Sequence, residues 1–292
     1  MIIKKQNLSV IIVSFKSNHV IHRCIESIHK DIKIIVIENS NDSKLKNELE
    51  KKYKNLKCIL SKENNGMGTG NNIGINYITT DFAFILNPDV ILENNAIDEI
   101  CEASKKIESF CILAPISKKS QFPNYKLDIN EKNTYDPINP FKVKSIDGYA
   151  MLLNLNRIKK LNEFNLFDEN IFLYLENDDL CLRLKKRNEN IYVVPKAKIN
   201  HLGGEAVDPK FKNEIELCRN WHWMWSKFYF NKKHYGFFSA FLSVFGNLTS
   251  AILKLIFYSI IFDDYKKKIY FMRISGIFNS ILGKKSFYRP KI

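Results

Sequence analysis

One short stretch of the sequence ends an apolar run with an amide and a carboxylate. Asn87, Pro88 and Asp89 follow the run from Phe82 to Leu86. Because proline cannot donate a hydrogen bond to a neighbouring strand, strand pairing should stop at Pro88. Open α/β sheets bind ligands at the carboxyl ends of their strands. The stretch therefore predicts a ligand site, with an ordinary Asn-Pro-Asp turn as the alternative.

A second stretch concentrates negative charge. Glu176, Asn177, Asp178 and Asp179 place three carboxylates within four positions. Like charges this close repel one another, so the cluster needs a compensating partner. A helix dipole could supply one, with Asn177 or Asp178 as the N-cap of a helix predicted over 180–186. A cation or a proton-transfer site is the alternative.

Two further features depend on their surroundings. The segment 63–74 contains four glycines, but in neither the G-x-G-x-x-G nor the phosphate-loop pattern. Such glycines let a backbone approach another group closely and can open a helix that favours anions, whereas a flexible turn is the alternative. His201 stands alone before Gly203 and Gly204. It becomes a ligand candidate only if the fold brings it to Asp89.

The elements that must position these side chains alternate along the chain. Apolar, β-branched runs predict buried strands, and helical spacing predicts helices between them. This alternation predicts a right-handed, mostly parallel α/β sheet. We expect strands over 8–15, 32–37, 56–60, 82–86, 145–155 and 191–194, a helix over 93–109, and a variable loop over 117–145.

The composition fits one large domain with an appendage. The 292 residues are 45% hydrophobic, and 45 basic against 31 acidic residues give a net charge of +14. This charge predicts an anionic membrane or phosphorylated substrate as partner, with a merely lysine-rich surface as the alternative. The lysines match no nucleic-acid-binding motif, so we expect no nucleic-acid partner. The six cysteines form no C-x-x-C pair and no signal peptide is evident, which predicts a reduced, cytoplasmic protein.

The C-terminal region, 211–292, is predicted to be helical and apolar. Residues 212–230 are rich in aromatic side chains, and 235–262 is long enough to span a bilayer. A narrow polar stripe on this segment favours a helix lying on a membrane, or packed as a hairpin, over a spanning helix. A buried helix or a homodimer is the alternative. The stripe consists of Ser239, Ser243, Asn247, Ser250 and Lys254, and basic flanks at 232–233 and 266–268 suit an anionic membrane surface.

A series of motifs in the same order resembles glycosyltransferase family 2, most closely its bacterial rhamnosyltransferase-like branch. SVIIVSFKS resembles the opening strand, and IVIENSND resembles V-D-N-x-S-x-D with Glu38 in place of Asp. ENNGMGTGNNIGI resembles N-x-G-F-x-x-G-x-N-x-G, and FILNPDVIL resembles the L-L-N-P-D-V form of the D-x-D motif. DGYAMLLN resembles x-G-A-x-M-L-x-R, and FLYLENDDLCLR resembles F-L-Y-x-E-D-x-D-L-C-x-R. The resemblance implies a GT-A nucleotide-diphospho-sugar transferase fold, Rossmann-like with a mostly parallel sheet, over 1–210. The apolar run and basic flanks described above predict that the helical region 211–292 is membrane-associated.

The resemblance also implies roles for single residues. Glu38 would accept an N–H of the nucleotide base, because a carboxylate is an acceptor only. Asn87 and Asp89 would hold Mn²⁺ or Mg²⁺ on the diphosphate, and His201 would be a further metal ligand that suits Mn²⁺ better. The remaining residues of the nucleotide-sugar site would be Ser14, Asn65, Gly66 and Asn72.

The catalytic base is the point at which the sequence departs from the family. The family often has Glu-Asp-x-Asp, and its first Asp is the base, whereas this chain has Asn177 there. An amide cannot take up a proton at neutral pH. Glu176 is therefore the first candidate for the base and Asp178 the second, while Asp179 orients or caps.

These features together predict a metal-dependent, inverting glycosyltransferase of the hexosyl- or rhamnosyltransferase kind. We expect a dTDP-, UDP- or GDP-sugar as donor and a glycan, lipid-linked, as acceptor, in surface polysaccharide synthesis for the cell envelope. The protein would be cytoplasmic and peripheral on the inner face of the plasma membrane. Asn177 leaves open a catalytically inactive family member that only binds nucleotide-sugar or glycan. The apolar C-terminus leaves open a membrane-bound assembly protein.

Overall fold

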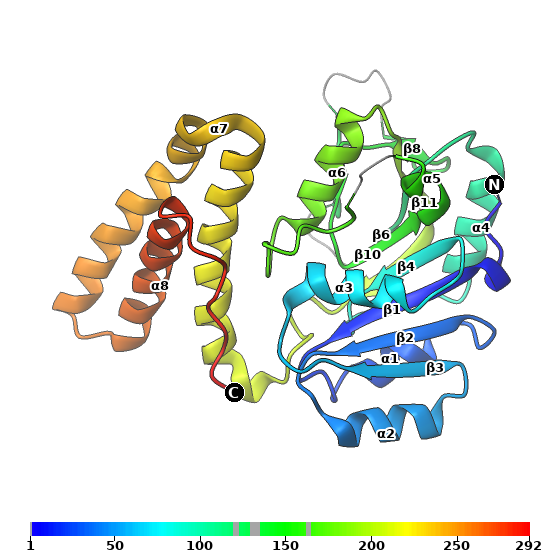
Figure 1. The fold of residues 1–292 in the computed structure, drawn as a ribbon, viewed down its shortest axis with the longest axis horizontal. Helices are drawn as coiled ribbons and strands as arrows, with labels where there is room; N and C mark the ends of the chain where they lie inside the picture. The colour runs from blue at the N-terminus through cyan, green and yellow to red at the C-terminus, as the bar shows by residue number, and fades with distance from the viewer. Residues whose placement is uncertain (1, 119–122, 129–134, 162–164) are drawn as a thin grey trace. The chain divides into compact units, whose positions relative to one another are not determined.

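The chain divides into two compact units. The computed structural model describes residues 2–118, 123–128, 135–161 and 165–292 (Figure 1). An α/β unit comprises Met1–Phe167 and Asn177–Asp208, and a helical unit comprises Asp168–Glu176 and Pro209–Ile292. The second unit therefore begins close to the predicted boundary at 210. It also takes in the segment 168–176, which the sequence did not indicate.

The first half of the α/β unit is a parallel sheet (Figure 1). Its strands lie in the order β3-β2-β1-β4, and every neighbouring pair is parallel. All residues of β1 are buried, as expected for a strand covered on both faces. The four predicted strands are confirmed to within a residue at each end. They are β1 (Leu8–Ser14), β2 (Lys33–Glu38), β3 (Leu56–Leu60) and β4 (Phe82–Leu86).

The other half of the sheet is mixed. β10 (Ala150–Asn154) runs antiparallel to β4 and to β6 (Ile112–Ser117), which pairs in parallel with β11 (Ile191–His201). β11 is longer than the predicted strand over 191–194. It continues past Pro195 because the register shifts between Val194 and Lys198, and such an irregularity tolerates the missing N–H of proline. On its far side β11 pairs antiparallel with β5 (Val90–Leu92), and it also pairs with β8 (Phe141–Lys142).

The predicted loop over 117–145 is only partly described, because 119–122 and 129–134 lie outside the described residues. Within the rest of it, β7 (Tyr125–Lys126) pairs with β9 (Ser145–Ile146) in a separate two-stranded sheet. The strand predicted over 145–155 is therefore two strands, β9 and β10. The interruption falls at residues 147–149.

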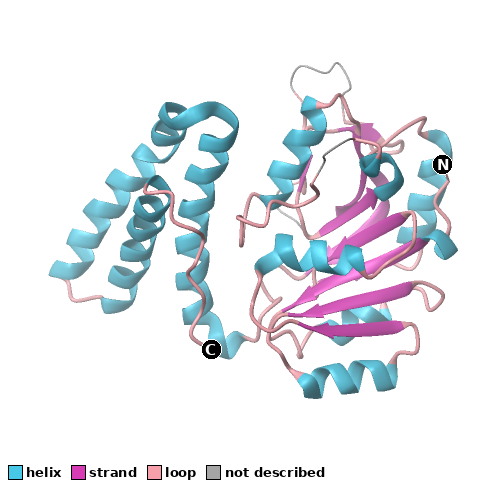
Figure 2. Ribbon diagram, viewed as in Figure 1, coloured by secondary structure: helices cyan, strands magenta, loops and turns pink. Residues whose placement is uncertain are grey.

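Helices cover both faces of the sheet (Figure 2). Side chains of a strand alternate between faces, so Val10 and Ile12 of β1 belong to one core and Ile11 and Val13 to the other. The first core includes side chains of α1 (Ile21–Glu26), α2 (Ser43–Lys52) and α4 (Ala96–Lys106). The second core includes side chains of α3 (Gly66–Asn76), α5 (Leu155–Lys159) and α6 (Glu176–Lys186).

The glycines of α3 bring that helix very close to β1. A Cβ atom at Gly70 would lie 2.8 Å from Cγ1 of Val13, and one at Gly74 would lie 2.5 Å from Cγ2 of Ile11. These two glycines therefore serve the packing of the helix on the sheet. Gly66 differs, because it begins α3 with a φ of 79°, a conformation that glycine adopts without strain.

The helical unit is built from two long helices, one of them sharply bent (Figure 1). α7 (Lys212–Ile260) breaks at Gly236, whose φ of 86° and ψ of 172° are not helical, so it consists of the helices 212–235 and 237–260. α8 (Asp264–Ile281) packs against α7. The approach is close, because a Cβ atom at Gly276 would clash with the carbonyl oxygen of Trp221. A small buried core forms from Met224, Phe228, Ala240, Val244 and Ile277.

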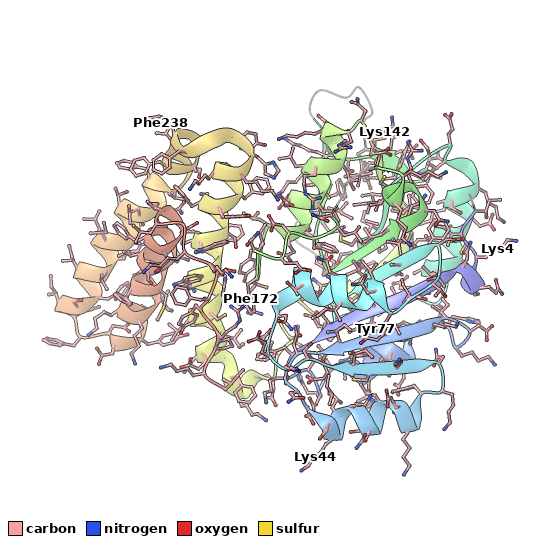
Figure 3. All side chains as sticks on the ribbon, viewed as in Figure 1. Lys4, Lys44, Tyr77, Lys142, Phe172 and Phe238 are labelled. Atoms are coloured by element: carbon pink, nitrogen blue, oxygen red, sulfur yellow. The ribbon has the colours of Figure 1, made fainter. Side chains whose placement is uncertain are left out.

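The helix 237–260 turns an apolar face to solvent. Phe238 is 84% exposed and Leu242 is 74% exposed, and the ring of Phe238 stands away from the helix (Figure 3). Leu253 and Ile260 are each 68% exposed on the same face. By length and composition alone, Pro209–Ile260 is the single helix of the described residues that could cross a membrane. The bend at Gly236 divides that helix.

The polar stripe of this helix contacts neighbouring helices, which agrees with packing as a hairpin, one of the two arrangements that the sequence favoured. Asn247 accepts a hydrogen bond of 2.7 Å from the ammonium group of Lys227, and the Lys254 ammonium lies 5.3 Å from the ring centre of Tyr270. Both partners belong to neighbouring helices of the same unit. Asn247 and Lys254 of the polar stripe therefore contribute to packing as a hairpin, although Ser250 and Lys254 are themselves exposed.

Candidate functional site

The carboxyl ends of the parallel strands carry the predicted polar groups. Ser14 lies opposite Glu38 in the β1–β2 register, and Ile12 lies opposite Leu86 in the β1–β4 register. Asn87 follows directly after Leu86. The register therefore brings the ends of β1, β2 and β4 to one edge of the sheet, as the sequence predicted.

The antiparallel pair β5–β11 brings Asp89 and His201 together. Val90 lies opposite His201, and the N–H of Leu202 donates to the carbonyl oxygen of Asp89 at 3.0 Å. Nε2 of His201 lies 3.4 Å from Oδ2 of Asp89. His201 was a ligand candidate only if the fold placed it close to Asp89, and the structure does so. The two residues are far apart in the chain, so no local sequence pattern indicates this contact.

The oxygens at this position fit a divalent cation. Asp89 is 1% exposed, and Oδ1 of Asp89 and Oδ1 of Asn87 are buried without a hydrogen-bond partner among the described residues. A buried carboxylate oxygen without a donor is costly unless a ligand completes it. Among the described residues no third His, Cys, Asp or Glu joins Asp89 and His201. The pair can hold a cation whose other positions are filled by ligand oxygens or water.

Tyr149 fixes the orientation of His201 and was missed by the sequence analysis. Its ring stacks on the His201 imidazole, with ring centres 3.9 Å apart and planes 23° apart. Its carbonyl oxygen accepts a 2.9 Å hydrogen bond from the N–H of Asn87. Burial raises the pKa of the Tyr149 phenol, so the hydroxyl stays protonated at neutral pH.

Glu38 presents one oxygen of a carboxylate that is otherwise fixed. Its Oε2 accepts hydrogen bonds from the N–H groups of Ser40 at 2.9 Å and Asp42 at 2.7 Å. Its Oε1 is buried and has no hydrogen-bond partner in the described structure, and the same holds for Oγ of Ser14 and Oδ1 of Asn39. Two acceptor oxygens and one hydroxyl group thus lie at the ends of two adjacent strands without partners, as a site for a ligand with N–H groups requires.

Asn39 is a second residue that the sequence analysis missed, although it lies inside the quoted motif IVIENSND. Its Nδ2 donates to the carbonyl oxygen of Gly66 at 3.1 Å and so ties the end of β2 to the start of α3. Asn65 immediately precedes α3 and donates to the carbonyl oxygen of Glu63 at 3.2 Å. Asn65 and Gly66 therefore adjoin the Glu38 end of the site.

The side-chain amide of Asn72, a predicted residue of the nucleotide-sugar site, is hydrogen-bonded to the backbone of Phe167. Its Nδ2 donates to the carbonyl oxygen of Phe167 at 2.9 Å, and its Oδ1 accepts from the N–H of Phe167 at 3.1 Å. Both ends of the amide are engaged by the backbone of a single residue. These bonds favour a positioning role for Asn72, because they fix the backbone at Phe167.

The acidic cluster does not cap its helix. α6 begins at Glu176, so neither Asn177 nor Asp178 precedes it, and the predicted N-cap is wrong. Asn177 donates to the carbonyl oxygen of Ile146 at 2.6 Å, and the Asp178 carboxylate pairs with Lys126 at 2.9 Å. Fully buried Asp179 pairs with Arg183 at 2.7 Å, and Arg183 also donates to the carbonyl oxygens of residues 165 and 166. Asp179 therefore orients its neighbours, as predicted.

Backbone strain lies directly before Glu176. Tyr174 and Leu175 have φ values of 69° and 68°, which side chains with a Cβ atom rarely adopt. Within the helical unit, Ser226 donates to the carbonyl oxygen of Leu173 at 2.8 Å, and the Tyr174 ring meets Trp223 edge-on at 5.3 Å. Strain that the surrounding contacts hold in place is typical of functional residues. Glu176 is the residue that these two strained positions orient.

Asp147 is a third residue that the sequence analysis missed. It lies between Ile146, which accepts the Asn177 hydrogen bond, and Gly148, where a Cβ atom would lie 3.2 Å from Cβ of Asn177. The pKa of Asp147 is raised, first by loss of hydration and then by the negative charge of Asp178. The quoted motif DGYAMLLN contains Asp147, but only its strand character was used.

The fold and this edge define the class of α/β proteins that bind ligands at the carboxyl ends of parallel strands. A family model described as Glycosyl transferase family 2 matches residues 9–163. This match covers more than half of the chain, and the chain belongs to glycosyltransferase family 2.

Curated relatives place the chain nearer one branch of the family. It is 26% identical over 205 residues to the low-salt glycan biosynthesis hexosyltransferase Agl10 of Haloferax volcanii, which covers 63% of this chain and 64% of that protein. It is 28% identical over 216 residues to the rhamnosyltransferase WbbL of Escherichia coli, which covers 64% of this chain and 80% of that protein. The chain thus matches less than two thirds of the length of the first relative. The two together support the rhamnosyltransferase-like branch.

Solved structures show the same fold. A mannosyltransferase, PcManGT from Pyrobaculum calidifontis in complex with GDP-Man and Mn²⁺, has a TM-score of 0.56 at 9% identity, covering 96% of this chain and 88% of that one. GalNAc-T7 with UDP, GalNAc and Mn²⁺ has a TM-score of 0.54 at 14% identity, covering 83% of this chain and 57% of that one. The predicted α/β GT-A fold with a helical C-terminal region is confirmed.

Proposed function

We propose that the chain is a glycosyltransferase that takes a sugar from a nucleotide-diphosphate donor with the help of Mn²⁺ or Mg²⁺. The observation that carries this proposal is the Asp89–His201 pair beside the unpartnered oxygens of Asp89 and Asn87. The relatives named as a hexosyltransferase and a rhamnosyltransferase support the activity. The similar structures that contain UDP or GDP-Man with Mn²⁺ support the donor class and the metal.

Each polar group at the sheet edge then has a task. Asp89, Asn87 and His201 would hold the cation on the diphosphate, where it would neutralise charge that develops on the leaving nucleoside diphosphate. Oε1 of Glu38 accepts an N–H of the nucleotide base, beside Ser14, Asn39, Asn65 and Gly66. Because Oε2 of Glu38 is already held by two backbone N–H groups, the carboxylate is oriented before the donor arrives.

Glu176 is the proposed base that takes the proton of the acceptor hydroxyl. The attacking oxygen then displaces the nucleoside diphosphate in line at the anomeric carbon and inverts its configuration. The strained residues Tyr174 and Leu175 support Glu176, because they fix where its backbone points. Asp178 is the second candidate, although its carboxylate already forms an ion pair with Lys126. The structure adds Asp147 as a third candidate, because its raised pKa favours accepting a proton.

The helical unit supports an acceptor at a membrane. Its helix 237–260 exposes large apolar side chains, and basic residues surround that helix in the sequence. An anionic inner leaflet matches both properties. We therefore propose a glycan acceptor that is lipid-linked, in cell-envelope polysaccharide synthesis, and a peripheral position on the cytoplasmic face of the plasma membrane. A second copy of the chain is the alternative cover for the apolar face.

The donor and metal are tested by a thermal-shift panel of UDP-, dTDP- and GDP-sugars, with and without Mn²⁺. A ligand that binds only the native state raises the melting temperature, so one nucleotide should do so and only with the metal. His201→Asn should reduce the advantage of Mn²⁺ over Mg²⁺, because it removes the nitrogen ligand. A panel in which no nucleotide sugar raises the melting temperature would contradict the proposal and favour an assembly protein.

The base is tested by comparing Glu176→Gln, Asp178→Asn and Asp147→Asn in pH–rate profiles. Loss of the general base lowers kcat by roughly 10²–10⁴-fold and removes the acidic limb of the profile. We expect this result for Glu176→Gln and smaller effects for the other two variants. If only Asp147→Asn lowered kcat in this way and removed the acidic limb, Asp147 would be the base instead of Glu176. If the wild-type protein binds the donor with Mn²⁺ but never hydrolyses or transfers it, the chain is instead a catalytically inactive member of the family. The presence of Asn177 is consistent with that alternative.

A further inference from the structure

The helical unit contains a basic recess that the proposed transfer reaction does not use. The recess has a volume of about 450 Å³ and lies between the end of the helix 212–235 and the turn after α8. Its lining combines aromatic and hydroxyl groups with four lysines. These residues are Trp225, Tyr229, Lys232, Lys233, Ser280, Lys284 and Lys285, with Asn170 and Gly283.

The walls of the recess are held in place by specific hydrogen bonds. Trp225 Nε1 donates to the carbonyl oxygen of Lys284 at 3.0 Å, and Ser280 Oγ donates to the carbonyl oxygen of Trp225 at 3.0 Å. Gly283 reverses the chain with a φ of 69°. Ser286 Oγ donates to the carbonyl oxygen of Asn170 at 2.6 Å and fixes the chain beyond the turn. The lysines therefore stand on a built frame.

The carboxylate beside the recess is already neutralised. One oxygen of Asp168 accepts from Tyr229 at 3.0 Å and from Lys233 at 2.7 Å, and the other accepts from the N–H and Nδ2 of Asn170. Burial is the largest influence on Asp168 and would raise its pKa, but the hydrogen bonds from Lys233 and Asn170 together with the Lys233 charge outweigh it, so the pKa is lowered. Asp168 is therefore a fixed anion, and its ion pair with Lys233 leaves that lysine with no net charge to offer a ligand.

Three positive charges remain without a counter-charge. Within the described part of the chain, Lys232, Lys284 and Lys285 form no ion pair, and all three are exposed. The whole region is also unbalanced. From Pro209 to the end it has fifteen Lys and Arg residues against four acidic ones, Glu214, Glu216, Asp263 and Asp264. A recess with an excess of ammonium groups is suited to an oxyanion with several acceptor oxygens.

The apolar face of the same unit indicates what carries that oxyanion. Phe237 and Phe238 follow the bend at Gly236, a few residues after the lysine pair 232–233. Their side chains are 46% and 84% exposed. We propose that the recess binds the phosphate or diphosphate group of a lipid whose hydrocarbon chain lies along the exposed face of the helix 237–260. This inference rests on the proposed membrane association and deepens it from a general attraction to a defined headgroup site.

The test compares two triple variants of the full chain in vesicle flotation. The recess variant is Lys232→Gln/Lys284→Gln/Lys285→Gln. The matched control, Lys212→Gln/Lys268→Gln/Lys291→Gln, removes the same charge from exposed lysines of the same unit that do not line the recess. Vesicles contain phosphatidylcholine alone, phosphatidylcholine with phosphatidylglycerol, or phosphatidylcholine with a polyisoprenyl diphosphate. Thermal melting of both variants checks that they are folded.

We expect the recess variant to bind one of the two phosphate-bearing vesicles about tenfold more weakly than the control variant does, because it loses charge-assisted hydrogen bonds as well as long-range attraction. The difference should persist at high salt, which screens only the long-range part. Selective loss on phosphatidylglycerol identifies a bilayer headgroup, and selective loss on polyisoprenyl diphosphate identifies a lipid-linked acceptor. Inorganic pyrophosphate should compete in the second case.

Equal losses in the two variants would overturn the inference, because charge alone would then explain binding. A wild type that binds no vesicle would overturn both the inference and the proposed membrane association. Neither result would affect the donor-dependent thermal shift, so failure of the recess is distinguishable from failure of the proposed transferase activity.

Discussion

The two units of this chain are incomplete in opposite ways. At its sheet edge the α/β unit buries polar atoms without partners, among them Oδ1 of Asp89 and Oε1 of Glu38. The helical unit exposes apolar side chains without cover, with Phe238 and Leu242 as the extreme cases. Buried polar groups call for a polar ligand and exposed apolar groups call for an apolar environment. The contrast indicates that one unit is completed by a small charged ligand and the other by a lipid surface or a second protein.

The largest expected effect is at the buried polar edge, with Asp89→Asn. This change keeps the shape of the side chain but removes the charge that would hold the cation. Metal ions contribute several kcal/mol of transition-state stabilisation, so kcat/KM for transfer should fall at least about 10²-fold. The free energy of unfolding without metal should stay the same or rise, because a nearly unpaired buried charge is removed.

Initial rates with donor and Mn²⁺, together with chemical denaturation, measure both quantities. Asp98→Asn on α4 is the control, because Asp98 is an exposed carboxylate that pairs with Lys5. If Asp89→Asn transferred sugar as fast as the wild type, the unpartnered oxygens at the sheet edge would not bind a cation needed for transfer. The contrast drawn between the two units would then be wrong.

The next effect tests the exposed apolar side of the comparison, with Phe238→Ser/Leu242→Ser. Burying a Phe or Leu side chain contributes about 1.5–3 kcal/mol, so vesicle partition should weaken by about tenfold to a hundredfold even if burial in the membrane is partial. The control is Tyr77→Ser/Ile138→Ser, which removes exposed apolar side chains of the α/β unit.

Light scattering of the same variants distinguishes the two possible partners of the exposed apolar face, a lipid surface and a second copy of the chain. A concentration-dependent dimer that the Phe238→Ser/Leu242→Ser change dissociates, without any vesicle binding, would show that a second copy covers the face. A monomer that binds vesicles would support the lipid surface.

A third effect comes from a buried base in the helical unit. Burial lowers the pKa of His222 to about 3, and its Nε2 donates to the carbonyl oxygen of Tyr288 at 2.8 Å. Between about pH 6.5 and pH 3 the unfolded chain binds a proton that the folded unit excludes. The free energy of unfolding should therefore fall as the pH drops through this range, by about 2 kcal/mol at pH 5.

Thermal melts from pH 7 to pH 4 test this, with acid expected to loosen the helical unit before the α/β unit. His222→Gln should remove this part of the pH dependence, because its amide can still donate to Tyr288 but does not titrate. His29→Gln, at an exposed position, should leave the dependence in place. A pH dependence that survives His222→Gln would contradict the assignment.

The smallest effects concern the bend that separates the apolar helix from the rest of α7. Gly236→Ala forces a Cβ atom into a backbone region used almost only by glycine, which should lower the free energy of unfolding by about 1–3 kcal/mol. Gly246→Ala is the matched control within the helix 237–260, where a Cβ atom meets open space. It should raise the free energy of unfolding by roughly 0.5–1 kcal/mol. Denaturant titration that gave both variants the same sign would show that α7 is not bent in solution.

Much of the α/β unit could be predicted because its signals are local. Strand β3 was placed at Leu56–Leu60 without error, and β4 ends at Leu86, where Asn87 and Pro88 interrupt the apolar run. β11 was predicted too short because proline usually ends a strand, whereas the β6 partner here carries the strand past Pro195 through a shift in register. A partner distant in sequence can override a local signal in this way.

The site divides along the same line. The chemistry of Asp89, Glu38 and His201 was visible from residue type and motif. Asp147 and Tyr149 lie in the quoted motif DGYAMLLN, but the motif does not show that the Tyr149 ring stacks on His201 or that Asp147 lies beside Asp178. Asn72 matched its motif, yet its amide is engaged by Phe167. Such pairings join residues far apart in the chain, so only the folded structure reveals them.

The sequence by itself determined the family, the order of the strands along the chain and the kinds of groups at their ends, because periodicity and motif are properties of neighbouring residues. Only the tertiary structure decided that His201 meets Asp89, and that Asn247 of the polar stripe bonds to a neighbouring helix while Phe238 and Leu242 are exposed. It alone formed the lysine recess from segments centred near 170, 230 and 284. The physical reason is that strand register and helix packing determine contacts across long stretches of chain, and no local pattern encodes them.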